Sequence, residues 1–315
     1  MAIAVTMCKL FAALILGYVL NKLGMLDEHT SKRLSAIIMN AVLPFLIISS
    51  VAGIDGSGGE VLLLFLAGVV CYAVFPLIGW LIVRLIGVKE GLRGTYMCMV
   101  MFSNNAFMGY PVVSALFGSS AIFYTTIFHM LFNLMVFSLG MMLIRKDAGV
   151  DGYLEEAPLR PRERVRVVRQ VVNNGVIASV LALVIYFCHI PLPEMVTETC
   201  SFIGNICMPL SMMVIGGSIA GYPLKDIFSE KRVYFITAVR LILMPVLVYL
   251  VMRLFTDNGE LIKVATITTG MPIASIVAMA STPYPEQGKA SAIAVVFSTL
   301  CSLVTIPVMC VLLGA

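Results

Sequence analysis

Ten apolar runs follow one another along the chain, and each is about as long as a helix that crosses a bilayer, for which about 20 residues suffice. The runs are, approximately, residues 2–21, 34–52, 61–86, 93–117, 120–144, 173–190, 200–221, 233–255, 261–282 and 289–313. Of the 315 residues, 60% are hydrophobic and only 12% are charged, whereas soluble domains carry about 25% charged residues. The sequence therefore predicts an all-α membrane protein with ten transmembrane helices.

The basic residues indicate the orientation of these helices, because Lys and Arg accumulate in cytoplasmic loops. If the chain starts outside, all but four of its 21 Lys and Arg residues fall in or beside cytoplasmic loops. The exceptions are Lys9 and Arg240, which lie inside apolar runs, and Arg253 and Lys263, which lie in external loops. We therefore expect a multi-pass protein of the cell membrane with both termini extracytoplasmic.

Several classes of function are disfavoured. The net charge of +4 is divided among short loops, so we expect no nucleic-acid partner. The eight cysteines are scattered and form no C-x-x-C pair, which predicts neither a zinc site nor a disulfide framework. The motifs H-E-x-x-H and G-x-S-x-G are missing from the sequence, as is an intramembrane acid pair, so a membrane-embedded hydrolase is disfavoured. We expect no enzyme activity, no metal and no cofactor.

A polar segment, residues 145–172, divides the chain into two halves of five runs each, 1–144 and 173–315. It carries both charge signs, and we interpret it as a cytoplasmic loop whose basic end can lie on anionic membrane lipid. The halves resemble each other: N-x-x-x-P occurs from Asn40 to Pro44 and again from Asn205 to Pro209. Because five is odd, the second half enters the membrane from the opposite side, which predicts two inverted five-helix repeats.

The fourth and ninth runs are interrupted near their centres. The interrupting residues are Ser103, Asn104, Asn105, Gly109 and Pro111 in the fourth run, and Thr268, Thr269, Gly270 and Pro272 in the ninth. Proline removes a backbone donor and glycine loosens the backbone, so we expect breaks at Gly109–Pro111 and Gly270–Pro272. Irregular backbone at this depth is tolerated only where it is buried in protein or lines a cavity. Two broken helices in corresponding positions indicate the substrate site of a secondary transporter.

Several motifs carry a resemblance to a known family. They are K-L-G-M-L-D (Lys22 to Asp27), L-P-F-L-I-I-S-S (Leu43 to Ser50), N-N-A-F-M-G-Y-P (Asn104 to Pro111), R-L-I-L-M-P (Arg240 to Pro245) and F-S-T-L-C-S-L-V-T-I-P (Phe297 to Pro307). With them the sequence resembles the auxin efflux carrier family, which includes bacterial carboxylate permeases and the plant PIN-type exporters. The resemblance covers nearly all ten runs.

This resemblance implies a fold similar to that of the bile acid/sodium symporters, in which two broken helices, here the fourth and ninth, cross at the membrane midplane. A crossover bundle formed by runs 3–5 and 8–10 would move against a scaffold of runs 1, 2, 6 and 7, which would also form a homodimer. Asn105 stands where threonine is usual, and the long central loop of the plant exporters is absent. Specificity for the plant hormone is therefore not implied.

The candidate site is an anion site. If Pro111 and Pro272 start the second half-helices, two positive helix ends converge at the membrane centre. Asn104 and Asn105 would donate side-chain amides to a carboxylate, with Ser103, Thr268, Thr269 and Ser275 as lesser candidates. Two alternatives remain open: the asparagines cap helix ends, or carbonyls freed at the ends of the first half-helices hold a cation such as Na⁺.

Two further residues are candidates for charge or ion coupling. Arg240 lies well inside a run, where it is either functional or reaches to the cytoplasmic surface. His129 is either a structural histidine or a proton carrier. The interiors of the runs contain no Asp or Glu, so transport would be driven by the membrane potential, by Na⁺ or through His129.

The leading hypothesis is thus a secondary transporter that moves small organic anions, such as malate, malonate or an auxin-like acid, by alternating access. The alternatives are a sodium-coupled importer of larger amphipathic anions and a sensor with a transport fold. The sequence leaves the substrate and the direction of flux open.

Overall fold

The computed structural model describes residues 2–51, 58–118, 120–149, 174–221, 230–281 and 283–314. Within these ranges the regular structure is helical, apart from one isolated bridge between Ser103 and Ile273. The helices are α1 Ala2–Lys22, α2 Glu28–Ile37, α3 Leu43–Ser49, α4 Gly58–Leu85, α5 Arg93–Met101, α6 Tyr110–Phe117, α7 Ser120–Met135, α8 Met141–Asp147, α10 Asn174–Phe187, α11 Glu194–Gly204, α12 Cys207–Ala220, α14 Lys231–Ala238, α15 Met244–Phe255, α16 Gly259–Thr269, α17 Ser275–Ser281 and α18 Pro285–Leu313. Most of the predicted loop 145–172 lies outside the described residues.

Six helical segments in the described ranges are long and apolar enough to cross a membrane. They are Glu28–Ser49, Gly58–Leu85, Ala121–Asp147, Glu194–Ala220, Lys231–Phe255 and Pro285–Leu313, and shorter apolar helices cover Asn105–Phe117 and Asn174–Phe187. Many large hydrophobic side chains on their surfaces are exposed, for example Leu77 and Leu254. A bilayer supplies the apolar surroundings that such a surface needs, so the fold is that of a multi-pass membrane protein.

Several long helices contain a proline without breaking. A π-helical turn precedes Pro44, Pro111 and Pro245 and ends two residues before each of them. These turns are η1 Ile38–Val42, η3 Asn105–Gly109 and η5 Val239–Leu243. Each turn contains the residue four positions before the proline, whose carbonyl the proline ring would otherwise meet. The wider turn thus accommodates the proline within a continuous helix.

The predicted break at Gly109–Pro111 is therefore wrong in position. Both residues lie inside the second half-helix, which runs without interruption from Asn105 to Phe117. The break lies at Phe102–Asn104, between the end of α5 and the start of η3. In the ninth run the break covers Gly270–Ala274, as the sequence indicated for Gly270 and Pro272.

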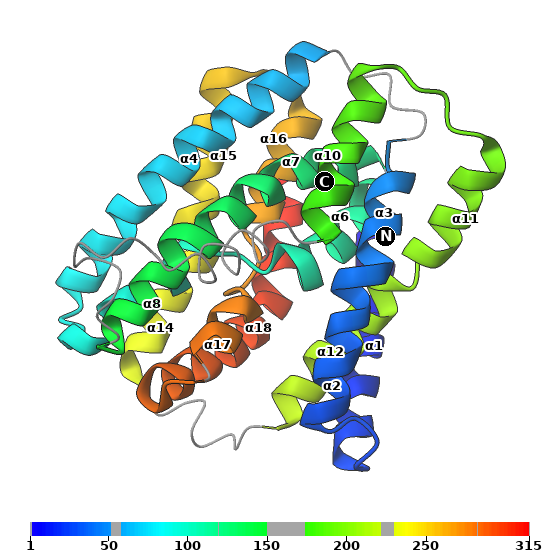
Figure 1. Cartoon of the computed structure of the whole chain (residues 1–315). Helices are drawn as coiled ribbons and strands as arrows, with labels where there is room; N and C mark the ends of the chain where they lie inside the picture. The colour runs from blue at the N-terminus through cyan, green and yellow to red at the C-terminus, as the bar shows by residue number, and fades with distance from the viewer. Residues whose placement is uncertain are drawn as a thin grey trace, which may run out of the picture.

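Figure 1 shows α1, α2, α3, α11 and α12 together on one side of the molecule, with α4, α14 and α15 on the other. α1 packs along α12, and α10 and α11 pack against α3. The contact of α1 with α12 is close because a glycine of each helix faces the backbone of the other: a Cβ atom at Gly17 would overlap the carbonyl oxygen of Met213, and one at Gly216 that of Leu14. Small residues allow helix backbones to approach closely in membranes.

Candidate functional site

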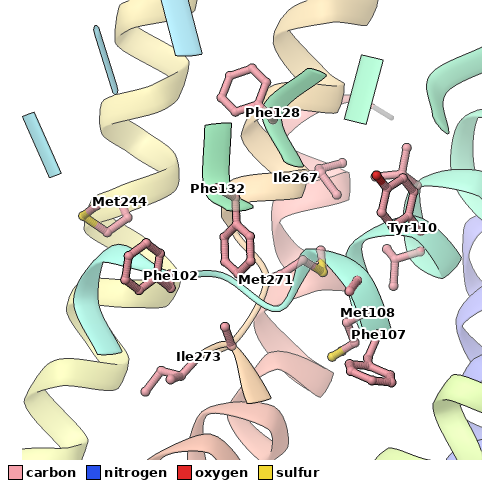
Figure 2. Packing of buried hydrophobic residues seen from close by; sticks show 14 of the residues in the cluster. Phe102, Phe107, Met108, Tyr110, Phe128, Phe132, Met244, Ile267, Met271 and Ile273 are labelled. Atoms are coloured by element: carbon pink, nitrogen blue, oxygen red, sulfur yellow. The ribbon is translucent and has the colours of Figure 1, made fainter. Parts of the chain in front are cut away.

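The breaks of the two interrupted helices lie side by side, and we call this paired region the crossing; Figure 2 shows it near Phe102 and Ile273. The amide of Asn104 donates to the carbonyl of Pro272 at 2.8 Å, and the amide of Ala274 donates to the carbonyl of Phe102 at 2.9 Å. The two extended segments thus form a short antiparallel pair around the bridge from Ser103 to Ile273. Each break satisfies backbone groups of the other, which irregular backbone at membrane depth requires.

The crossing brings the ends of four half-helices together. The first halves, α5 and α16, end there at Met101 and Thr269, and the second halves begin there at Asn105 and Ser275. Pro272 lies inside the extended segment three residues before α17, so the prediction that it starts the second half-helix is wrong. Its missing amide is no loss at this position, because only its carbonyl is used in the pairing.

Arg240 holds the ends of the two first half-helices. It is fully buried. Its Nη1 donates to the carbonyls of Val100 at 2.9 Å and Met101 at 3.5 Å, and its Nε to that of Met271 at 3.3 Å. Its Nη2 donates to the carbonyl of Thr269. The guanidinium therefore lies where the negative ends of two helix dipoles meet, which is favourable for a cation.

This placement argues against one of the two interpretations of Arg240, that it reaches to the cytoplasmic surface. The side chain does not reach to a membrane surface, because it is buried and its donors bind backbone carbonyls in the crossing. Those carbonyls are also the ones expected to hold Na⁺ in the alternative site. A guanidinium already satisfies them, since its planar group offers five donors in fixed directions.

A cavity of about 240 Å³ borders the crossing. The crossing contributes the segments 103–107 and 274–276 with Met279. The helix α7 contributes His129, Phe132 and Asn133, and the π-helical turn η4 Val136–Gly140, which continues α7, contributes Val136 and Phe137. The remaining wall comes from α2 and η1, through Lys32, Ser35, Ala36, Met39 and Asn40. The cavity therefore lies between the crossing and a helix of the group that contains α1 and α12.

Buried polar side chains of the cavity are only partly satisfied. Asn104 Nδ2 donates to Ser275 Oγ at 3.2 Å, and Ser103 Oγ donates to Asn105 Oδ1 at 2.8 Å. Nδ2 of Asn105, Nδ2 of Asn133 and Nδ1 of His129 are buried and have no hydrogen-bond partner within the described residues. Buried groups of this kind cost free energy unless a ligand or water pairs with them.

The histidine is held by aromatic neighbours. The His129 ring stacks on Phe132, with ring centroids 5.1 Å apart and planes 14° from parallel, and meets the edge of Tyr110 at 5.4 Å. Its ring plane is thereby fixed while Nδ1 stays unpaired.

The helix ends around the cavity favour negative charge. The second half-helix begins at Asn105, beside the cavity, and the amide of Asn105 itself donates to the carbonyl of Ser103 at 2.8 Å. The positive end of its dipole lies at the same place. Lys32, whose side chain is 60% exposed and pairs with Glu28 at 2.6 Å, adds a cation to the lining.

The predicted site residues fall into two sets. Ser103, Asn104, Asn105, Ser275 and His129 line the cavity. The others belong to the crossing or to the helices around it. Gly109 and Pro111 lie within the second half-helix, and Gly270 packs closely on Met309. Thr268 Oγ1 lies 3.4 Å from Thr125 Oγ1, Thr269 Oγ1 donates to the carbonyl of Ala265, and the carbonyl of Pro272 accepts from the amide of Asn104.

Sequence reasoning missed two kinds of residue. One is Asn133, which follows His129 by four positions and therefore lies on the same helix face. Asp147 was also missed: its carboxylate accepts from the amides of Gly94 and Thr95 at 3.0 and 2.6 Å, and from the Thr95 hydroxyl at 2.9 Å. It thus caps the start of α5 from the end of α8, a contact that no local pattern reveals.

A multi-pass helical fold with a polar cavity at two crossed, broken helices is the architecture of a membrane transporter. The model of the membrane transport protein family matches residues 2–310. The chain therefore belongs to this family, that of the auxin efflux carriers. It is 25% identical over 316 residues to an uncharacterized transporter of Methanothermobacter thermautotrophicus, and the match covers 98% of this chain and 97% of that one.

Proposed function

We propose that this protein is a secondary transporter that moves small organic anions, of the mono- or dicarboxylate class, by alternating access. The observation that carries the proposal is the cavity at the start of the second half-helices, where Asn105 and Asn133 have unpaired amide donors. A carboxylate accepts hydrogen bonds only. Donors, a positive helix end and Lys32 therefore match its chemistry.

The cavity favours a small substrate over a large amphipathic one. Its volume of about 240 Å³ is below the range of roughly 300–1,000 Å³ that drug-sized ligands occupy. The sodium-coupled import of larger anions, the alternative from the symporter fold, is thus less favoured.

The position of Arg240 bears on coupling. Its guanidinium binds the half-helix carbonyls that would otherwise be Na⁺ ligands. We propose that transport does not depend on Na⁺ at these carbonyls and is driven by the membrane potential or by proton transfer at His129. The unpaired Nδ1 of His129 in the cavity supports the second route.

The proposed topology has ten transmembrane helices in two inverted repeats, with both termini outside the cell membrane. Helices occupy all ten predicted runs, which supports this arrangement. The scaffold would comprise α1, α2, α3, α10, α11 and α12, and the cavity lies between α2 and the crossing. Met195 and Phe202, which are 80% and 78% exposed on α11, are apolar surface suited to a scaffold homodimer.

The test is the flux of labelled malate, malonate, lactate and indole acetate in proteoliposomes under imposed Na⁺, pH and voltage gradients. We expect uptake or release of at least one acid, unchanged when Na⁺ is replaced by choline. Asn104→Ala and Asn105→Ala should abolish this flux, while Asn205→Ala, at an exposed helix junction away from the cavity, should not. Wild-type flux in both cavity variants would overturn the site. Tight binding without flux would indicate a sensor instead.

The proton route has its own measurement. His129→Gln keeps a planar polar side chain but cannot carry a proton at neutral pH. If His129 couples transport to protons, this variant loses acceleration by a pH gradient and keeps acceleration by voltage. An unchanged response to the pH gradient would leave the membrane potential as the driving force.

A further inference from the structure

A second cavity, of about 590 Å³, lies between α15, α16 and α18. Its wall is mainly apolar, with Val246 from α15, Ile262 from α16 and Val308 from α18 among the lining residues. Val304, Val308 and Leu312 of α18 are 67%, 51% and 80% exposed. The cavity is therefore open to whatever surrounds the helices, and around a membrane-spanning helix that is lipid.

Two cations, Arg253 and Lys263, line this cavity. They are the same two basic residues that the charge pattern assigns to external loops, against the general bias of the chain. Lys263 Nζ donates to the carbonyl of Gly314 at 2.6 Å, which keeps it beside the end of α18. Arg253 is exposed and has no hydrogen-bond or ion-pair partner within the described ranges. Both cations lie near helix ends, where lipid headgroups are found.

We propose that this cavity binds an anionic phospholipid, with an acyl chain against α15 and α18 and the phosphate beside Arg253 and Lys263. The apolar wall matches the chain, and the cations match the headgroup charge. The hydroxyl of Thr305 lines the cavity and is buried without a partner, so it offers a further polar contact. The cavity extends to Leu241 and Ile242, so the lipid would contact the π-helical turn that carries Arg240.

A second copy of the chain is a poorer occupant of this face. In a symmetric dimer the same patch meets itself. Arg253 and Lys263 would then approach the same cations of the other copy, and like charges in contact are unfavourable. An anionic lipid neutralises both cations instead.

The test is native mass spectrometry of the delipidated full chain, titrated with phosphatidylglycerol or phosphatidylcholine of identical acyl chains. We expect the wild type to prefer phosphatidylglycerol by roughly thirtyfold, which two cations at headgroup level supply. The double variant Arg253→Gln/Lys263→Gln should lose this preference. The matched control Lys89→Gln/Lys231→Gln, which removes two exposed cations elsewhere, should keep it.

A second variant tests the apolar part of the cavity. Val308→Trp leaves both cations in place, and its larger side chain would fill the cavity from an exposed position. It should therefore weaken binding of both lipids. Equal binding of the two lipids to the wild type, or an unchanged preference in the double charge variant, would overturn the proposal. So would a Val308→Trp variant whose dimer fraction changes while its lipid binding does not.

Discussion

Asn104 donates its side-chain amide to the hydroxyl of Ser275 at 3.2 Å, although 171 positions separate the two residues. One residue precedes the second half of the first broken helix, and the other starts the second half of the other broken helix. The hydrogen bond therefore joins two helix starts that face the same cavity. The Asn104 side chain makes no capping hydrogen bond to the helix that follows it, so its observed role is to join the two helix starts rather than to cap one of them.

The first prediction concerns Asn105→Asp. The change keeps the size of the side chain and the acceptor for Ser103, but it replaces the unpaired donor with negative charge. Since like charges repel strongly away from water, we expect anion flux in proteoliposomes to fall at least about a hundredfold, or roughly 2.7 kcal/mol. Asn205→Asp, at an exposed site, is the control. Retained flux in Asn105→Asp would show that no anion binds beside this residue.

The second prediction concerns Arg240→Met, which removes the donors to four backbone carbonyls. Each buried acceptor left unpaired costs about 1–3 kcal/mol. We therefore expect a large fall in the thermal midpoint in detergent, or loss of folded protein, measured by size-exclusion chromatography after heating. Arg240→Lys should be intermediate, because a compact ammonium cannot reproduce the planar fork. The control Arg232→Met removes a partly exposed arginine and should have little effect on the midpoint. Equal stability of Arg240→Met and the wild type would contradict the role of Arg240 in binding the half-helix carbonyls.

The third prediction concerns the contact between α1 and α12. A methyl group at Gly216 would overlap the carbonyl oxygen of Leu14, which is backbone and cannot rotate away. Gly216→Ala should therefore destabilise the protein by about 1–3 kcal/mol, measured as a lower thermal midpoint. Gly221→Ala is the matched control, since its nearest atom would be 3.5 Å away. A normal midpoint for Gly216→Ala would mean that the two helices are free to separate.

The fourth prediction concerns pH. Hydrogen bonds from the Thr30 side chain and backbone amide lower the pKa of Asp27, the N-cap of α2, below its ordinary value of 3.8. The carboxylate therefore contributes stability above pH 3.8, and this contribution is lost as the pH falls through the lower pKa of the folded state. Asp27→Asn keeps a capping oxygen without the charge. Its thermal midpoint should fall less than that of the wild type on acidification from about pH 5 to about pH 3; parallel curves would contradict the cap.

Much of the fold follows from the sequence because lipid imposes strong local rules. Apolar runs of sufficient length gave the helices, and polar residues in mid-membrane indicated where they break. Only the break in the fourth run is misplaced, because Gly109 and Pro111 do not break the helix there. Pro111 instead follows a π-helical turn that accommodates its ring, and the chain extends at Phe102–Asn104, where pairing with Pro272 and Ala274 is available.

The site was predictable only in part for the same reason. Asn104, Asn105 and Ser275 line the cavity, and the sequence points to them because amides and hydroxyls are unusual in apolar runs. The sequence does not reveal the role of Arg240, because its partners are the carbonyls of Val100 and Thr269 on two other helices. Thr269 contributes its backbone rather than its side chain to that contact. Such roles depend on the tertiary arrangement, which side-chain type does not encode.

The pairing of Phe102–Asn104 with Pro272–Ala274 has a mechanical consequence. If the chain bent at only one of the two breaks, the backbone hydrogen bonds between them, from Asn104 to Pro272 and from Ala274 to Phe102, would be lost. Unpaired backbone groups are costly at membrane depth. Arg240 also links the two broken helices, because it donates to the carbonyl of Val100 in one and to that of Thr269 in the other. If the protein works by alternating access, as we propose, we therefore expect the two paired helices to shift along α2 as one rigid body rather than to hinge at either break.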